Sequence, residues 1–139
     1  MIGVVIVTHF RLAEELLQAL TLIVGERPNF RAIGLDPSLA PEEMRSRIEK
    51  AIREVDKESG VLVLVDMFGG TPSNLSMSFL DEDHVEVITG LNLPMLVKSA
   101  QLKEGIPIHE AAVLVRDYGQ RNIRTASDVL AGRDGAEDG

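Results

Sequence analysis

A histidine and an aspartate each come directly after an uninterrupted apolar run of the sequence. His9 comes after residues 2–8, which are rich in valine and isoleucine, and Asp66 comes after a second run at residues 61–65. Runs without polar alternation are typical of strands that are buried on both faces of a parallel sheet. Because such folds bind ligands at the carboxyl ends of their strands, we expect His9 and Asp66 to lie close enough to touch.

An imidazole that is held by a carboxylate can act as a nucleophile. The carboxylate keeps one ring nitrogen as a hydrogen-bond donor, which leaves the lone pair of the other nitrogen free to attack. The carboxylate would also stabilise the positive charge that develops when this nitrogen is phosphorylated. His9 and Asp66 are therefore the predicted catalytic residues.

The segment after the second apolar run, residues 66–74, has the sequence Asp-Met-Phe-Gly-Gly-Thr-Pro-Ser-Asn. Thr71 suits the N-cap of a helix and Pro72 suits its first position, so free backbone N–H groups should face the crevice. Glycines let the backbone approach a phosphoryl group closely, and hydroxyls add donors. The predicted phosphoryl-binding residues are Thr8, Gly69, Gly70, Thr71 and Ser73.

Each of these features has a plain structural explanation when it is taken alone. A histidine after a strand is often a capping residue, an aspartate there can cap a turn, and many loops place glycine before a helix cap. Their combination favours a phosphohistidine site. The other histidines are expected to lie elsewhere, with His84 on the surface at the opposite end of the sheet and His109 capping a helix or solvated.

The elements that must position the site alternate along the chain. Apolar spacing and turn residues predict further strands at residues 30–35 and 85–88, and helices at residues 11–24, 41–57, 72–80, 93–100 and 108–119. This alternation predicts one α/β domain over residues 1–131, with a doubly wound, mostly parallel sheet of order 2-1-3-4 and helices on both faces. Residues 132–139, a small polar and acidic tail, are expected to be disordered.

Composition and charge narrow the possible functions. With 139 residues, 45% of them hydrophobic, the chain can bury a core, and with no cysteine it lacks thiolate metal sites and thiol redox chemistry. The sequence shows neither a spanning apolar segment nor a signal peptide, which makes a cytoplasmic protein the expectation. A net charge of −8 argues against nucleic acid and suits a basic protein partner.

Cofactor-dependent classes are poorly supported. Neither a GxxxxGK[ST] loop nor a GxGxxG fingerprint comes after the first strand, so a nucleotide-binding enzyme is disfavoured. His9 and Asp66 supply only two ligands, fewer than a zinc site uses. A two-component receiver would have acidic residues where His9 stands. We therefore expect no metal and no cofactor.

Three motifs in order resemble one family. They are Thr8-His9, the run Val65 to Asn74, and Gly90 to Leu96 with the sequence Gly-Leu-Asn-Leu-Pro-Met-Leu. In type and spacing they resemble the enzyme IIA component of the mannose family of the bacterial phosphoenolpyruvate-dependent sugar phosphotransferase system. The similarity runs from residue 1 to about residue 100 and continues more weakly to about residue 130.

The resemblance implies a role for the whole protein. His9 would accept a phosphoryl group on Nε2 from the phosphohistidine of the histidine-containing phosphocarrier protein and pass it to a histidine of an enzyme IIB partner, while Asp66 holds Nδ1. Contact with the membrane would be indirect, through permease subunits. The resemblance also implies a homodimer in which a short C-terminal strand, here Asn122 to Thr125, is exchanged and pairs antiparallel at the sheet edge.

One position departs from the family, and two other functions remain open. Relatives commonly carry glycine directly after the histidine, where this chain has Phe10, a ring that narrows the crevice and affects partner choice or transfer rate. The first alternative is a regulatory protein whose phosphorylation state is read by a partner. The second is the phosphocarrier subunit of a dihydroxyacetone kinase, which usually lacks the Phe-Gly-Gly-Thr-Pro-Ser-Asn pattern.

Overall fold

The computed structural model describes residues 1–133, and strands and helices alternate through most of this part of the chain. The elements come in the order β1 (Gly3–His9), α1 (Leu12–Val24), β2 (Phe30–Leu35), α2 (Pro41–Val55), β3 (Val61–Val65), α3 (Thr71–Met77), β4 (Val85–Thr89), α4 (Leu93–Ala100), α5 (Ile108–Arg121) and α6 (Ala126–Leu130). The predicted helices and strands up to α5 are confirmed, with ends that differ by a few residues. The sequence pattern does not indicate α6.

Within the described residues the strands form one parallel sheet of order β2-β1-β3-β4, which confirms the predicted fold class. The chain runs outward from β1 to β2 on one side, and from β3 to β4 on the other. The crevice between the ends of β1 and β3 is therefore the switch point of the fold. Val7 of β1 pairs with Val65 of β3, so the chain leaves both strands at the same edge of the sheet.

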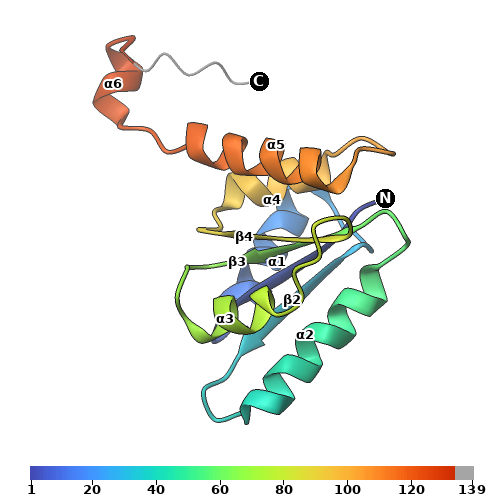
Figure 1. The fold of residues 1–139 in the computed structure, drawn as a ribbon. Coiled ribbons are helices and arrows are strands. Elements are labelled where there is room, and N and C mark those ends of the chain that lie inside the picture. The colour runs from blue at the N-terminus through green and yellow to red at the C-terminus, as the bar shows by residue number, and fades with distance from the viewer. Residues whose placement is uncertain (134–139) are drawn as a thin grey trace.

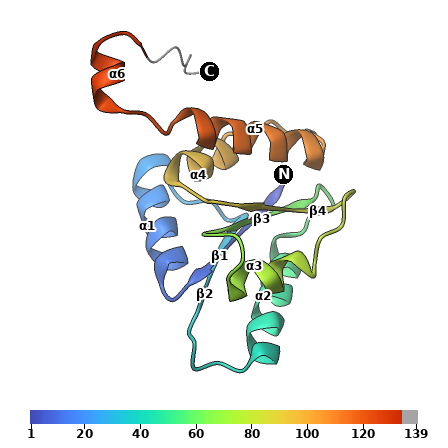
Figure 2. The same ribbon diagram turned by 60° about the vertical axis from the view of Figure 1, so that its left-hand side comes forward.

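Helices cover both faces of the sheet, as predicted. Figures 1 and 2 show α1, α4 and α5 on one face and α2 and α3 on the other. Successive strand residues point to opposite faces, so each strand supplies apolar side chains to two separate cores. Val4, Ile6, Leu62 and Leu64 pack in the first core, and Val5, Val7, Val63 and Val65 pack in the second.

No helix within residues 1–133 is both long enough and apolar enough to span a bilayer. Of the predicted tail, the structure describes Gly132 and Arg133, and Arg133 Nε donates to Asp128 Oδ1 at 3.0 Å. The rest of that prediction, residues 134–139, lies outside the described residues.

The predicted edge strand at Asn122 to Thr125 does not form within the single chain, and its exchange with a second copy stays a prediction. The backbone N–H of Asn122 donates to Tyr118 O and that of Ile123 donates to Gln120 O, so both groups continue the last turn of α5. A strand needs a neighbouring strand with which its backbone can form hydrogen bonds. This segment instead leads away from the sheet to α6, which projects from the body in Figures 1 and 2. The outer edge of β4 has no partner strand among residues 1–133.

His84 lies at the end of the sheet opposite the switch point, as predicted, but it is half-buried and paired. Its Nε2 lies 2.7 Å from Asp56 Oδ2, which ties the start of β4 to the end of α2. Burial raises the pKa of Asp56, but hydrogen bonds from His84 and from the backbone N–H of Glu58 outweigh it. The pKa of Asp56 is therefore lowered from its ordinary value of 3.8.

The lowered pKa of Asp56 predicts a contribution to stability that depends on pH. Because the folded state favours the carboxylate, the contribution is present above pH 3.8 and is lost as the pH falls through the lower folded pKa. Asp56→Asn should lower the urea midpoint at pH 7 and should lose less stability than the wild type below pH 3.8. Equal pH dependence of the two midpoints would contradict the pairing.

Candidate functional site

His9 and Asp66 meet at the switch point, which confirms the predicted contact. His9 is the last residue of β1 and Asp66 comes directly after β3, and His9 Nδ1 lies 2.8 Å from Asp66 Oδ2. The imidazole is 51% exposed, whereas the carboxylate is only 12% exposed. The imidazole is therefore accessible to a partner protein, while its Nδ1 is held by a carboxylate that is nearly buried.

Backbone groups fix the carboxylate of Asp66. The backbone N–H of His9 donates to Oδ2 at 2.9 Å, and the backbone N–H of Met67 donates to Oδ1 at 2.9 Å. With the ring nitrogen, three donors reach one carboxylate. Asp66 therefore bridges the ends of β1 and β3 as well as orienting the imidazole.

The Asp66 contact decides which nitrogen of His9 can react. A carboxylate can only accept hydrogen bonds, so Nδ1 carries the proton and its N–H donates a hydrogen bond to Oδ2. In the neutral ring Nε2 then holds the free lone pair. The arrangement presents Nε2 as a nucleophile with a negative charge fixed behind the ring.

Gly70 packs directly against the reactive side of the imidazole. A Cβ built on Gly70 would lie 2.7 Å from His9 Cε1 and 2.9 Å from His9 Nε2, closer than real contacts. Its φ of −89° and ψ of 175° suit any residue, so the requirement for glycine here is steric. Gly69 differs, because its φ of +92° lies in the region that favours glycine.

The start of α3 is shifted by one residue from the prediction. Gly70 is the N-cap, Thr71 is the first helical residue, and the backbone N–H of Asn74 donates to Gly70 O at 2.9 Å. The predicted N-cap role of Thr71 is therefore wrong. Thr71 is exposed and borders the same hollow as His9, so its hydroxyl remains available at the site.

Two of the predicted phosphoryl-binding hydroxyls have other positions. Thr8 is buried, and its Oγ1 accepts from the backbone N–H of Ala13 at 2.7 Å and donates to His9 O at 3.1 Å. It therefore holds the start of α1 against the end of β1. Ser73 is fully buried, and its Oγ has no partner among the described residues. Neither side chain lines the hollow beside His9.

A hollow of about 210 Å³ lies beside the imidazole. Apart from His9 and Thr71 its lining consists of apolar side chains from the ends of β1 and β2, the start of α3 and α2, namely Phe10, Leu35, Pro37, Met44 and Pro72. Phe10 has a φ of +48°, which is uncommon for a residue with a side chain. The sequence identified Phe10 as unusual but did not reveal this conformation.

Gly34 is a supporting residue that the sequence analysis missed. A Cβ on Gly34 would overlap the backbone carbonyl of Phe10, and the N–H of Gly34 donates to Glu14 Oε2 at 3.2 Å. A glycine inside an apolar strand is a signal of such a close backbone approach. Gly34 thus lets the chain that leaves His9 cross the end of β2.

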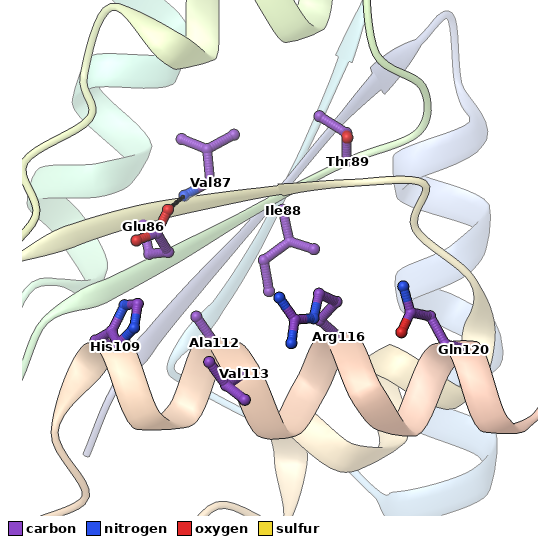
Figure 3. A pocket seen from close by; sticks show the side chains of 9 residues that line it. All are labelled: Glu86, Val87, Ile88, Thr89, His109, Ala112, Val113, Arg116 and Gln120. Atoms are coloured by element: carbon purple, nitrogen blue, oxygen red, sulfur yellow. Dashed lines mark hydrogen bonds between the residues drawn. The ribbon is translucent and has the colours of Figure 1, made fainter.

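A second hollow lies far from His9. Figure 3 shows a groove between β4 and α5, into which His109, Arg116 and Gln120 project from the helix. Its volume is about 360 Å³, and it runs along Glu86 to Thr89 at the outer edge of β4. No residue of the His9 site lines it.

Comparison with known proteins identifies the family. Residues 3–115 match the family described as the PTS system fructose IIA component. The mannose-specific EIIAB component of Escherichia coli strain K12 is 34% identical over 125 residues, which cover 88% of this chain and 39% of that protein. The fructose-specific EIIA component of Bacillus subtilis strain 168 is 29% identical over 131 residues, covering 94% and 90% of the two chains.

The fold agrees with a solved structure of the same kind. Phosphotransferase system component EIIA from Streptococcus agalactiae superposes with a TM-score of 0.81 at 27% identity, covering 91% of this chain and 98% of that one. The chain spans 39% of the length of the Escherichia coli protein, so it corresponds to a part of that relative. Since the family match extends over most of the sequence, the chain belongs to the mannose-type enzyme IIA family of the bacterial sugar phosphotransferase system.

Proposed function

We propose that this protein is a phosphocarrier in sugar uptake. His9 accepts a phosphoryl group on Nε2 from the phosphohistidine of the histidine-containing phosphocarrier protein and passes it to a histidine of an enzyme IIB partner. The observation that carries the proposal is the 2.8 Å contact between His9 Nδ1 and Asp66 Oδ2, which leaves the lone pair of Nε2 free in a half-exposed imidazole. The protein is a carrier, because the phosphoryl group resides on it between two transfers.

Asp66 supplies the electrostatic part of the mechanism. The lone pair of His9 Nε2 forms the new P–N bond while the P–N bond of the donor breaks and its electron pair stays on the donor imidazole. The ring of His9 gains positive charge, which the adjacent carboxylate stabilises without having to move. In the second transfer the same steps run toward the acceptor, and the charge on the ring is lost.

The loop between β3 and α3, which contains Gly69 and Gly70 and is called the glycine loop here, positions the phosphoryl group in this mechanism. Gly70 leaves backbone beside Nε2 without a side chain in the way, and the exposed hydroxyl of Thr71 can donate to a phosphoryl oxygen. Phosphoryl transfer depends mainly on positioning and on charge stabilisation, and hydrogen-bond donors from a loop provide both. Thr8 contributes by its hydrogen bonds to the start of α1 and Ser73 by packing, since neither side chain lines the hollow.

Sugar uptake is favoured over a purely regulatory role. The relatives carry the names of mannose-specific and fructose-specific components, and the phosphohistidine chemistry would be the same in either case. The match to enzyme IIA also outweighs the alternative of a dihydroxyacetone kinase subunit. We place the protein in the cytoplasm, where it would reach the membrane through its permease partners only. Genes for permease subunits beside its own would support transport, whereas a lone gene would support regulation.

The proposed assembly is a homodimer that exchanges Asn122 to Thr125. The free edge of β4 and the groove beside it offer a place for an added strand, and an unpaired edge favours pairing with another chain. Ile123 is 76% exposed and Leu130 of α6 is 89% exposed, as expected for side chains that a second copy would cover.

The nucleophile is tested by phosphorylation with phosphoenolpyruvate, enzyme I and the histidine-containing carrier. The wild type should take up one phosphoryl group per chain, and His9→Gln should take up none, because the amide has no reactive lone pair. His109→Gln is the matched control, since His109 is exposed and remote from the site, and it should label like the wild type. Full labelling of His9→Gln would refute the assignment.

Gly70→Ala tests the positioning loop. The added methyl group would come within 2.9 Å of His9 Nε2, so the ring must shift. Misplacement of a reacting group by about 1 Å can slow a reaction roughly 100-fold, and a loss approaching that size is expected in the labelling rate, measured by rapid quench. The thermal midpoint should change little, and Asn74→Ala, an exposed change on α3, should label normally. An unchanged rate of phosphorylation in Gly70→Ala would contradict the close packing of Gly70 against the His9 imidazole.

Light scattering tests the dimer. The wild type should have about twice the 15.2 kDa mass of one chain. Ile123→Asp should shift the mass toward the monomer, because a charge would be buried in the exchanged segment. Ile23→Asp changes another exposed isoleucine, on α1, and should leave the dimer intact. A monomeric wild type would rule out the exchange.

A further inference from the structure

Phe10 has a backbone conformation that its side chain makes costly. Its φ is +48°, in the left-handed region that glycine adopts freely and an aromatic residue rarely adopts. The conformation is imposed from both sides, because its N–H donates to Leu35 O at 3.0 Å and its carbonyl lies against Gly34. Glycine would meet these constraints without strain. A large side chain that persists in such a position points to a role for the side chain itself.

The ring of Phe10 lies at the reactive side of the site. Phe10 and His9 line one hollow of about 210 Å³, together with Pro72 at the start of α3. Gly70 packs against His9 Nε2 and is followed directly by Thr71 and Pro72, which line the hollow, so the hollow adjoins the loop on the Nε2 side of the imidazole. The ring is 55% exposed and Arg11 lies over it, with Cζ 5.4 Å from the ring centre. The side chain therefore contributes little to the core and borders the same hollow as the reactive imidazole.

Hydrolysis is the side reaction that a phosphohistidine carrier must limit. In it a water oxygen bonds to phosphorus, the P–Nε2 bond breaks, and its electron pair returns to Nε2. The water gives up a proton to solvent, and inorganic phosphate leaves. Acceptor groups near phosphorus orient the attacking water and take up its proton, whereas hydrocarbon surfaces provide no such groups.

We propose that Phe10 shields phosphorylated His9 from water and thereby lengthens the life of the phosphohistidine. This rests on the proposed phosphorylation of His9. The ring, with Leu35, Met44 and Pro72, covers one flank of the phosphoryl group with hydrocarbon. The hydroxyl of Thr71 borders the same hollow as a hydrogen-bond donor, which a phosphoryl oxygen can accept from, and the exposed part of the imidazole stays open to a partner imidazole. Phe10 thus reduces transfer to water while leaving transfer to protein possible.

The experiment compares lifetimes of the phosphorylated protein. All variants carry His84→Gln and His109→Gln, so that His9 is the only histidine left to hold the label. The protein is loaded either by the carrier or directly with phosphoramidate, the donor is removed, and the decay of phosphohistidine is measured by phosphorus NMR. Phe10→Gly and Phe10→Ala should shorten the half-life about threefold or more, and Phe10→Leu should retain most of it.

Two controls separate shielding from a structural role. Glycine relieves the strain at position 10 and alanine does not, so Phe10→Gly should be the more thermostable of the two. If the half-lives of the two variants are equally short, they do not follow stability, and the loss of the ring is their common cause. Phe68→Ala removes another exposed ring, 72% exposed, which does not line the hollow, and it should leave the half-life unchanged.

Each contrary result has its own meaning. Half-lives of Phe10→Gly and Phe10→Ala equal to that of the parent protein would overturn the shielding role. Slower transfer from the carrier with an unchanged half-life would overturn it too, because the hollow would then be a contact for the partner protein. If the carrier fails to label the parent protein, the proposed function fails, whereas lifetimes after loading with phosphoramidate still decide the shielding role.

Discussion

The site depends on one oxygen atom, Asp66 Oδ2, which accepts from both the ring and the backbone N–H of His9. This double contact can form only if β1 and β3 are adjacent and end together, and the pairing of Val7 with Val65 meets that condition. The register is in turn maintained by two cores, because every residue of these strands from Val4 to Val7 and from Val61 to Val65 is buried. The chemistry of a half-exposed imidazole is thus determined by packing on both sides of the sheet.

Close approach of backbone is the second constraint, and it explains glycines at positions where the backbone angles are ordinary. Gly70 makes room for the imidazole, and Gly34 makes room for the chain that leaves it. Gly34 lies near the carboxyl end of β2, and Gly70 lies in the loop after β3. A partner protein must reach His9 at this edge of the sheet. The two glycines therefore keep the nucleophile accessible while its carboxylate partner stays nearly buried.

The sequence predicted the fold and the contact between His9 and Asp66 well because both depend on local signals. Uninterrupted apolar runs identify buried strands, and the residue directly after such a run lies at the sheet edge whatever the details of packing. The hydroxyls were harder, since Thr8 and Ser73 face a helix start and a buried interface that no local pattern reveals. The segment from Asn122 to Thr125 was predicted as a strand, but in one chain its N–H groups complete the end of α5. A strand there would require a neighbour that lies beyond the single chain.

Phe10, Thr71 and Pro72 border the hollow beside His9, and Gly70 packs against its Nε2, so access to this atom is confined to one face of the protein. For a carrier this means that donor and acceptor must occupy the same footprint, so they bind in turn and never together. Tight binding of either partner would block the other and stall the relay. A relay of the proposed kind through this site would therefore favour brief encounters with both partners, because each must leave before the other can bind.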